Sequence, residues 1–460
     1  MILFRAAGVE SRSLAALVRS GPHELDARAL VSRMLLHPPY TNGETIYRSI
    51  TAIHAPCIIP AIDDAPAMTS ATAVAETRSA LEHAVERAFA GVKRVAVLTG
   101  GGLDSSALLA LAVSAARRSG GSAFGVALDF GGEGDDRPHL AALEAHLGCE
   151  ILRVRPEEAA HRFALVHEGV DATPLTWPGG AMEIELMARA RAHGAERALT
   201  GAGADDLFDG EPRALADVAR GGELRRATAA ARRLRGFGRP RSPIVSWLAR
   251  PLLARLAPRS LRAWRARHAP LRAQPWLTPL ARRFMEEWRD HQIERTYAHD
   301  DSARARLTAR LTAPHLEHLA WLRHQEEVGS GLERLDPYLD PALVAAITRI
   351  PRALLLHGDV RRGLFREALG ELLPESLRRR LDKASFEPAF ARFVEGAGGF
   401  EPLRSLASVA QLGALGLVEP RAFRKAFDAF VATASESTCN GWGTVWPVLA
   451  VEAFLATREA

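Results

Sequence analysis

The chain has 460 residues, enough for two or three domains with a large core, and its 47% apolar and 25% charged residues are typical of a water-soluble protein. No apolar run approaches the roughly 20 uncharged residues that span a bilayer, and the start lacks a signal-peptide pattern. We therefore expect a cytoplasmic protein without a membrane partner. Cys57, Cys149 and Cys439 lie far apart without metal-ligand spacing, so we expect reduced thiols.

Residues 1–72 predict a short α+β unit that precedes the main body of the chain, 73–460. Arg28 to Leu36 is helix-like, and the stretch 41–60, T-N-G-E-T-I-Y-R-S-I-T-A-I-H-A-P-C-I-I-P, alternates as strands around a turn do. A small-residue connector follows, and a helix over about 75–90 leads to the next strand.

The stretch from Val95 to Ser106 reads V-A-V-L-T-G-G-G-L-D-S-S and predicts a strand, a tight turn and a helix start. Glycine N–H groups and a helix N-terminus form a favourable environment for phosphate oxygens. The loop lacks the Walker lysine and does not fit G-x-G-x-x-G. It resembles the S-G-G-x-D-S loop of ATP pyrophosphatases, with Gly100 at the first serine; a plain Gly-rich turn is the alternative. The residues expected to bind ATP here are Thr99, Gly100, Gly101, Gly102, Asp104, Ser105 and Ser106.

Strands and helices alternate after this loop. Strands are predicted over 95–98, 123–130, 150–154 and 196–200, and helices from Asp104 to Arg118, over 137–147 and over 181–193. This alternation predicts an α/β fold with a parallel sheet covered by helices on both faces. Ligands then bind at the carboxyl ends of the strands, where the glycine loop lies.

A second loop, T-G-A-G-A-D-D-L-F-D-G over 200–210, follows the strand at 196–200. Asp205 and Asp206 follow this strand, flanked by Gly201 and Gly203, at the same edge of the predicted sheet as Asp104. Magnesium prefers one or two protein carboxylates together with phosphate oxygens. We therefore expect Asp104 and Asp205 to hold Mg²⁺ and Gly201 and Gly203 to contact ATP, although an Asp/Gly turn explains the second loop alone.

The two loops together resemble the asparagine synthetase superfamily of amide-forming, adenylating enzymes, which includes asparagine synthetases, β-lactam synthetases and lasso-peptide cyclases. The resemblance extends over most of 93–460. Its further motifs are D-D-R-P-H at 135–139, G-L-E-R-L-D-P-Y-L-D at 331–340, R-R-G-L-F-R-E-A-L at 361–369 and L-P-E-S-L-R-R-R-L-D-K at 373–383. It implies a PP-loop-type fold, with the segment 1–72 as a truncated glutamine-amidotransferase unit. Ile2 stands where such units carry a cysteine, so we expect no glutamine hydrolysis.

By this resemblance Lys383 is a catalytic residue that faces the acyl-adenylate, together with Asp104 and Asp205; a solvated lysine is the alternative. Lysine is rare in this arginine-rich chain, so a compact point charge is favoured here. Ala202 stands where asparagine synthetases have glutamate and β-lactam synthetases have tyrosine. Both of these relatives become weaker models, because Ala202 cannot accept a proton.

An insertion over about 211–310 begins with an arginine-rich segment. Residues 211–272 hold 16 arginines, no lysine and 3 acidic residues, whereas the whole chain has a net charge of +5. The segment also carries Trp247, Trp264 and the sequence P-W-L-T-P, a combination that resembles lasso-peptide cyclases. A solvated arginine face is the alternative. No RNA- or DNA-binding motif accompanies it, so we expect no nucleic-acid partner.

The sequence therefore predicts an ATP- and Mg²⁺-dependent ligase that activates a side-chain carboxylate of a precursor peptide as an acyl-adenylate. The peptide's own N-terminal amine then closes a macrolactam. The resemblance implies a leader peptidase and a precursor-recognition protein as partners. A stand-alone amide ligase and an inactive ATP-binding scaffold are the alternatives.

Overall fold

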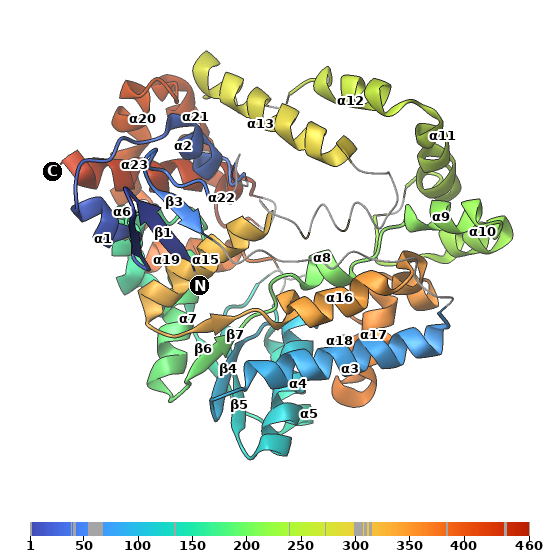
Figure 1. Ribbon diagram of the computed structural model, residues 1–460. Coiled ribbons are helices and arrows are strands. Elements are labelled where there is room, and N and C mark those ends of the chain that lie inside the picture. The colour runs from blue at the N-terminus through green and yellow to red at the C-terminus, as the bar shows by residue number, and fades with distance from the viewer. Residues whose placement is uncertain are drawn as a thin grey trace.

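Five parallel strands form the sheet that carries both loops in the computed structural model (Figure 1). They are β4 (Arg94–Leu98), β5 (Ser122–Leu128), β6 (Ile151–Val154), β7 (Arg197–Leu199) and β8 (Arg334–Leu335), in the order β6-β5-β4-β7-β8. The structure describes residues 2–37, 39, 43–53, 68–132, 135–238, 240–271, 273–298, 307, 311, 315–382, 385–436 and 439–459. The predicted parallel α/β fold is confirmed, and β8 adds a strand that the sequence did not predict.

Helices cover both faces of this sheet, as the residues of β4 show. Val95 and Val97 lie in one core with helices α3 (Ser70–Ala88) and α4 (Leu103–Ser119). Ala96 points to the other face and packs in a separate core with α7 (Gly180–Ala192). Because Val95, Ala96 and Val97 are all buried, the middle of this central strand is a continuous apolar run rather than an alternating one.

The predicted helices are present with nearly the predicted bounds. Helices α4 and α5 both end at glycines in the left-handed region, Gly120 with φ +68° and Gly148 with φ +57°. The helices outside the insertion, besides those above and those of the N-terminal unit, are α5 (Arg137–Leu147), α6 (Ala164–Glu168), α8 (Ala204–Phe208), α15 (His315–Ser330), α16 (Pro341–Arg349), α17 (Gly363–Leu369), α18 (Glu375–Arg379), α19 (Glu387–Gly396), α20 (Ala410–Ala414), α21 (Pro420–Thr433), α22 (Gly441–Thr444) and α23 (Trp446–Glu459). Short 3-10 segments occupy Pro156–Phe163, Pro337–Leu339, Arg352–Asp359, Gly370–Leu372, Glu401–Leu403 and Leu406–Ser408.

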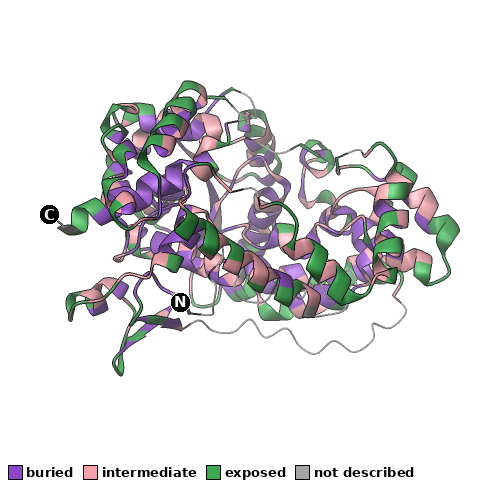
Figure 2. Ribbon diagram, turned by 90° about the horizontal axis from the view of Figure 1, so that it is seen from above, coloured by how far each residue is buried: buried purple, intermediate pink, exposed green. Residues whose placement is uncertain are grey.

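The N-terminal segment forms a small antiparallel sheet that packs on the C-terminal helices. Strands β1 (Leu3–Ala6), β2 (Val9–Ser11) and β3 (Thr51–Ile53) pair in the order β2-β1-β3, beside α1 (Leu14–Arg19) and α2 (Ala27–Met34). Phe4 of β1 contacts Trp321 of α15, with 5.4 Å between the ring centroids. These residues share one continuous core with α21 and α23, which Figure 2 shows in purple. The division of the chain at residue 72 stays a prediction, and Cys57 lies outside the described residues.

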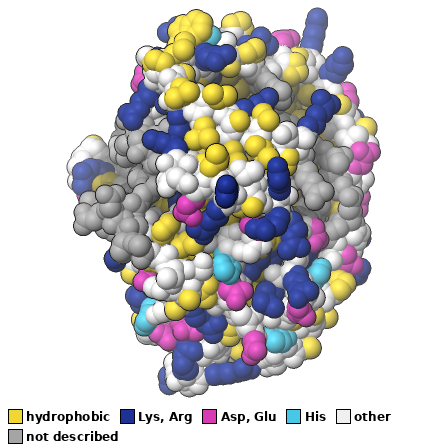
Figure 3. All heavy atoms as spheres, turned by 90° about the vertical axis from the view of Figure 1, so that its right-hand side faces the viewer, with side chains coloured by type: hydrophobic (Ala, Val, Ile, Leu, Met, Phe, Trp, Pro, Cys, Tyr) yellow, Lys and Arg dark blue, Asp and Glu magenta, His cyan; other side chains and the backbone are white. Residues whose placement is uncertain are grey.

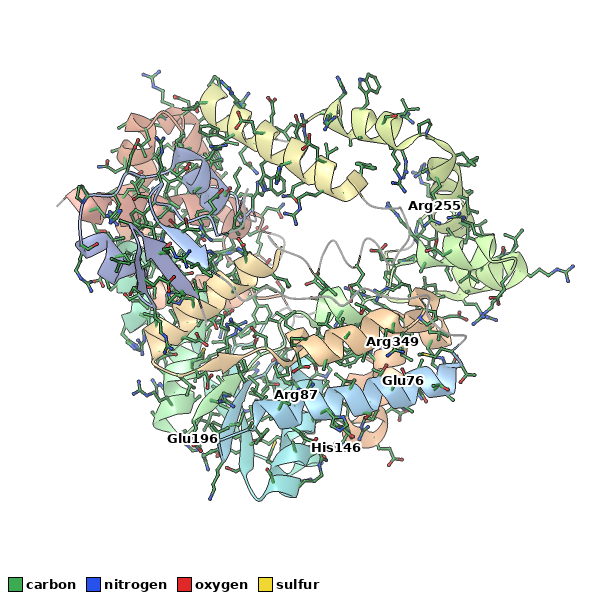
Figure 4. The ribbon with its side chains drawn as sticks, in the orientation of Figure 1. Glu76, Arg87, His146, Glu196, Arg255 and Arg349 are labelled. Atoms are coloured by element: carbon green, nitrogen blue, oxygen red, sulfur yellow. The ribbon has the colours of Figure 1, made fainter. Side chains whose placement is uncertain are left out.

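The insertion forms a series of helices that arches away from the sheet (Figure 1). They are α9 (Ala214–Arg220), α10 (Leu224–Arg233), a π-helical turn (Val245–Ala249), α11 (Arg250–Leu256), α12 (Arg259–Arg267) and α13 (Pro279–Ala298). Arg255 of α11, labelled in Figure 4, pairs with Asp217 of α9 at 2.5 Å. Helices α11 and α12 bury no residue, and Leu256 is 80% exposed. Basic and apolar side chains therefore mix on this face (Figure 3). Among the described residues, no helix has the length and apolar character needed to cross a bilayer.

Candidate active site

The glycine loop joins β4 to α4 and is held by bonds within the protein. The N–H of Gly100 donates to the Ser105 hydroxyl at 3.0 Å, and the Ser106 hydroxyl donates to the Gly100 carbonyl at 3.1 Å. The N–H of Gly101 donates to Asp136 Oδ2 at 2.8 Å. The N–H groups of Gly100 and Gly101 therefore already bond to protein side chains, and α4 begins directly after Gly102. The helix N-terminus is the anion-favouring element that remains at the pocket.

Asp136 and Arg380 form an ion pair that holds the glycine loop in place. The Arg380 guanidinium donates to Asp136 Oδ1 at 2.6 Å and to the Gly101 carbonyl at 2.7 Å. A Cβ on Gly101 would lie 2.7 Å from both partners, so the backbone must approach them as closely as only glycine allows. Asp136 is 5% exposed and Arg380 is 7% exposed, which fixes the pair and the loop on it.

Asp104 and Asp205 meet on the guanidinium of Arg362. One terminal nitrogen of Arg362 pairs with Asp104 and the other with Asp205, while its Nε lies 2.5 Å from Asp209 Oδ1. Arg361 pairs with Asp209 and lies 3.8 Å from Asp205. The carboxylates that the sequence predicted at one edge of the sheet do converge, around a positive charge from a segment that follows about 150 residues later.

Buried groups below Asp104 fix the second loop and the start of α4. The Tyr338 hydroxyl donates to the Asp104 carbonyl at 2.8 Å, and the Thr200 hydroxyl donates to Asp336 Oδ1 at 2.5 Å. Burial, and then the charge of Asp104, raise the pKa of Tyr338 well above its ordinary value, so this phenol stays a donor. Gly203 has φ +88°, and a Cβ there would lie 2.4 Å from Leu339. The turn before α8 therefore requires glycine.

A pocket of 440 Å³ opens beside these loops. Thr99, Gly100, Gly102, Asp104, Ser105 and Gly201 form part of its wall. Four aromatic rings, Phe130, Phe386, Phe390 and Trp177, line it further on in a continuous series, with neighbouring ring centroids 6.0, 6.5 and 6.1 Å apart. One end of the pocket is thus polar and backbone-rich, and another surface is aromatic.

Five arginines line the pocket wall, alongside an equal number of carboxylates. The arginines are Arg334, Arg361, Arg362, Arg366 and Arg380. Burial, and then the nearby charge of Arg362, lower the pKa of Arg366 to about 10, so it remains a cation at neutral pH. A cation at this position can contact the phosphate oxygens of a nucleotide.

A family comparison identifies the type of this site. The model of the family described as asparagine synthase matches residues 76–456, which include both loops and the strands that carry them. The chain belongs to the asparagine synthase family. Membership supports ATP-dependent amide-ligase chemistry for the pocket. Comparison with curated proteins gives no significant match.

A solved structure of the U34-tRNA thiolase NcsA from Methanococcus maripaludis, with its [4Fe-4S] cluster, is similar at 13% sequence identity and a TM-score of 0.26. The alignment covers 55% of this chain and 80% of the thiolase.

Most of the predicted site residues of this asparagine synthase family member lie together. Thr99, Gly100, Gly102, Asp104, Ser105 and Gly201 line the pocket, and Asp205 is joined to Asp104 through Arg362. Gly101, Ser106 and Gly203 serve the internal geometry of the two loops, as described above. Lys383 lies outside the described residues, so its predicted position next to the acyl group stays a prediction.

Several residues of the site were not singled out by the sequence. Asp136, Tyr338, Arg362 and Arg380 lie in the motifs that carried the family resemblance, but nothing in their spacing indicated which side chain of each motif reaches the loops. Glu183 and Glu326 also line the pocket and belong to no such motif. A buried glutamate in a helix could have been flagged only once its neighbours were known.

Proposed function

We propose that this chain is an ATP-dependent peptide cyclase of the lasso type. A side-chain carboxylate of Asp or Glu in a precursor peptide attacks the α-phosphate of ATP and forms an acyl-adenylate, with release of pyrophosphate. The N-terminal amine of the same peptide then attacks the acyl carbon and displaces AMP, which closes a macrolactam. Family membership supports the ligase chemistry, and the choice of a peptide substrate is the proposed part.

The observation that carries the proposal is the composition of the pocket. Its loop end offers the N-terminus of α4 and the Asp104 carboxylate, which suit a nucleotide and its metal ion. Its aromatic surface, from Phe130 to Trp177, suits the apolar side chains of a peptide.

Asp104 and Asp205 are the proposed ligands of Mg²⁺. Among the described residues no group of three or more metal-ligating side chains is arranged around one point. Two carboxylates that already share a cationic partner nevertheless suit magnesium, which keeps waters and phosphate oxygens as its other ligands. The ion would neutralise phosphate charge during attack at the α-phosphate. Arg361 and Arg366 then assist by binding the remaining phosphate oxygens.

Lys383 is the proposed catalytic cation of the second step. It follows Asp382, which lines the pocket and whose carboxylate lies 3.1 Å from Arg380. A fixed ammonium close to the acyl carbon would stabilise the oxyanion that forms when the amine attacks. The family resemblance assigns this role to the last residue of the motif at 373–383.

The peptide must be held in a threaded shape while its ends meet, which costs loop-closure entropy. The insertion, with its mixed basic and apolar surface, is a proposed contact for the peptide or for the partners that deliver it. Those partners are a leader peptidase and a precursor-recognition protein. A stand-alone amide ligase for a small amine is the second candidate. It is favoured because residues of this chain alone line the pocket. An inactive scaffold is the third, favoured by Gly100 and Ala202.

Product analysis tests the proposal. The protein is incubated with ATP, Mg²⁺ and a leaderless precursor peptide encoded beside its gene. The proposal predicts AMP, pyrophosphate and a peptide product lighter by one water. AMP with amide formation only on an added small amine would support the stand-alone ligase. Bound but unconsumed nucleotide would support the scaffold, and ADP would contradict adenylation.

A further inference from the structure

We propose that Glu183 and Glu326 form the subsite that receives the attacking primary amine, binding it as an ammonium and taking up its proton. This inference rests on the proposed amide-ligase function and adds a group that the family motifs did not supply. Ala202 has no acidic or basic side chain, and Asp205 and Asp209 of the second loop pair with Arg362, so the proposed proton acceptor comes from elsewhere in the pocket. Both glutamates line that pocket.

The two glutamates come from helices that approach each other closely. Glu183 lies in the first turn of α7 and Glu326 in α15. A Cβ on Gly329 would lie 2.8 Å from the side chain of Ile184, so the helices are as close at this point as a glycine permits. The close crossing presents both carboxyl groups to the same pocket.

Glu326 has one engaged oxygen and one without a donor. Its Oε2 lies 2.5 Å from Arg334 Nη1. Its Oε1 is buried and accepts no hydrogen bond from the residues that the structure describes, although Glu326 is only 2% exposed. A buried carboxylate oxygen without a donor is costly, so it is suited to a ligand that donates a proton. Glu183 accepts a hydrogen bond from Trp177 Nε1 at 3.0 Å, which fixes its direction.

The local charge favours a cation. Glu183, Glu326 and Asp336 surround Arg334, which contacts Glu326 and Asp336. Arg323 adds only a contact of 3.9 Å with Asp336. Burial raises the pKa of Glu326 well above its ordinary value; the charge of Arg334 opposes this effect, and the like charge of Glu183 and a side-chain hydrogen bond between the two glutamates add to it. The pair therefore gains free energy from either a shared proton or a bound cation.

A primary ammonium meets these requirements better than other cations. It has three N–H donors, enough for the open oxygen of Glu326 and for Glu183. Arg334 already pairs with the other oxygen of Glu326, and Trp177 already donates to Glu183. The N-terminal amine of a peptide and a small alkylamine share this chemistry.

The proposed step balances as follows. The bound ammonium gives one proton to the carboxyl pair and becomes a free amine. Its lone pair forms the C–N bond with the acyl carbon, and the C–O bond to AMP breaks with its electron pair leaving on the phosphate. The second proton of the nitrogen passes to that phosphate as the adduct collapses. The products are the amide and AMP.

Binding of glycinamide to the full chain tests the subsite without requiring turnover. Isothermal titration calorimetry compares glycinamide, which has a free amine, with N-acetylglycinamide, which has none. We expect the wild type to bind glycinamide and not the acetylated compound. Glu326→Gln and Glu183→Gln should each weaken this binding about tenfold or more, because a charge-assisted bond is lost. Glu333→Gln, which changes an exposed glutamate beside Arg334, is the matched control and should bind within twofold of the wild type.

Equal binding of both compounds, no binding by the wild type, or unchanged binding in both glutamate variants would overturn the assignment. If Glu326→Gln does not fold, the less buried Glu183→Gln carries the test. A kinetic comparison separates this inference from the proposed function. In a single turnover with ATP and the precursor peptide, the variants should still release one equivalent of pyrophosphate but form the amide about 100-fold more slowly than the wild type. A wild type that releases no pyrophosphate refutes the proposed function, while glycinamide binding still decides the subsite.

Discussion

The guanidinium of Arg362 pairs with the carboxylate of Asp104 and, through its other terminal nitrogen, with Asp205. Arg362 is 5% exposed and takes φ +56°, a left-handed conformation that a residue with a side chain adopts at some cost. The backbone before α17 is therefore shaped to bring this side chain to the two loops. Arg362 therefore places its positive charge between Asp104 and Asp205, the proposed Mg²⁺ ligands.

Removing Arg362 should destabilise the protein and strengthen its response to Mg²⁺. In Arg362→Ala three carboxylates lose their shared cation, so we expect a loss of about 2–4 kcal/mol in the free energy of unfolding. Urea denaturation measures it, with the more exposed Arg361→Ala as the control that loses less. Mg²⁺ should raise the Tm of Arg362→Ala more than that of the wild type. A loss below about 0.5 kcal/mol would mean that the ion pairs of Arg362 with the three carboxylates do not stabilise the fold.

Asp104→Asn and Asp205→Asn should each lower pyrophosphate release about 100-fold or more while the protein stays folded. Asp104 and Asp205 lie in the first turns of α4 and α8 at the edge of the pocket, where an amide of the same shape is tolerated, whereas their carboxylates are the proposed ligands of the metal that neutralises phosphate charge. Pyrophosphate release under saturating ATP is measured, with circular dichroism as the folding check. Wild-type turnover in either variant would remove that residue from the metal site.

The contrast between two neighbouring glycines tests the support behind the loop. In Gly101→Ala the new methyl group would lie 2.7 Å from Asp136 and Arg380, so one of them must move. We expect a loss of about 1–3 kcal/mol in stability and weaker ATP binding. A Cβ on Gly102 meets nothing within 4 Å, so Gly102→Ala should change the stability by less than about 0.5 kcal/mol. Equal stabilities for the two variants would show that the Asp136–Arg380 pair does not fix the loop.

Asp171 should make the stability depend on pH in the acid range. Its carboxylate accepts bonds from Ser13 at 2.6 Å, His324 at 2.8 Å and the N–H groups of Leu14 and Ala15. Burial acts to raise the pKa of Asp171, but these bonds outweigh it and lower the pKa to about 2. The stabilisation is complete above the unfolded-state pKa of about 3.9 and is lost as the pH falls through 2.

Replacing Asp171 by asparagine should remove most of this stabilisation, about 2 kcal/mol at neutral pH. Between pH 5 and pH 2, the free energy of unfolding measured by denaturant titration should then fall less steeply for Asp171→Asn than for the wild type. Asp26→Asn is the control, because asparagine caps a helix as well as aspartate does. Parallel pH curves for wild type and Asp171→Asn would contradict the assignment.

Lys383→Ala should still bind ATP and release pyrophosphate but slow amide formation in a single turnover by about 100-fold to 1,000-fold. Lys383→Arg should not restore the rate fully, because a guanidinium is larger and directs its donors differently. Lys425→Ala removes another lysine and is the charge control. Amide formation by Lys383→Ala within threefold of the wild type would leave Lys383 without a role in the mechanism.

The meeting of Asp104 and Asp205 could be predicted because parallel strands deliver their carboxyl ends to one edge of a sheet. Strand β8 could not, because it has two residues, Arg334–Leu335, and two residues carry no periodicity. The position of the Arg362 side chain could not be predicted either, since it depends on a left-handed backbone conformation that tertiary contacts maintain. Glu326 illustrates the same limit: its helix is ordinary in sequence, and only the close crossing at Gly329 buries its carboxyl group.

The central claim is that a carboxylate is activated by bonding to the α-phosphate of ATP, and an isotope measurement tests it most directly. A leaderless precursor peptide with oxygen-18 in its side-chain carboxyl groups is incubated with the protein, ATP and Mg²⁺. The account predicts one oxygen-18 atom in each AMP formed during cyclisation, because the acyl C–O bond breaks and the carboxyl oxygen stays on the phosphate. Unlabelled AMP, or oxygen-18 in inorganic phosphate with ADP as the nucleotide product, would contradict it.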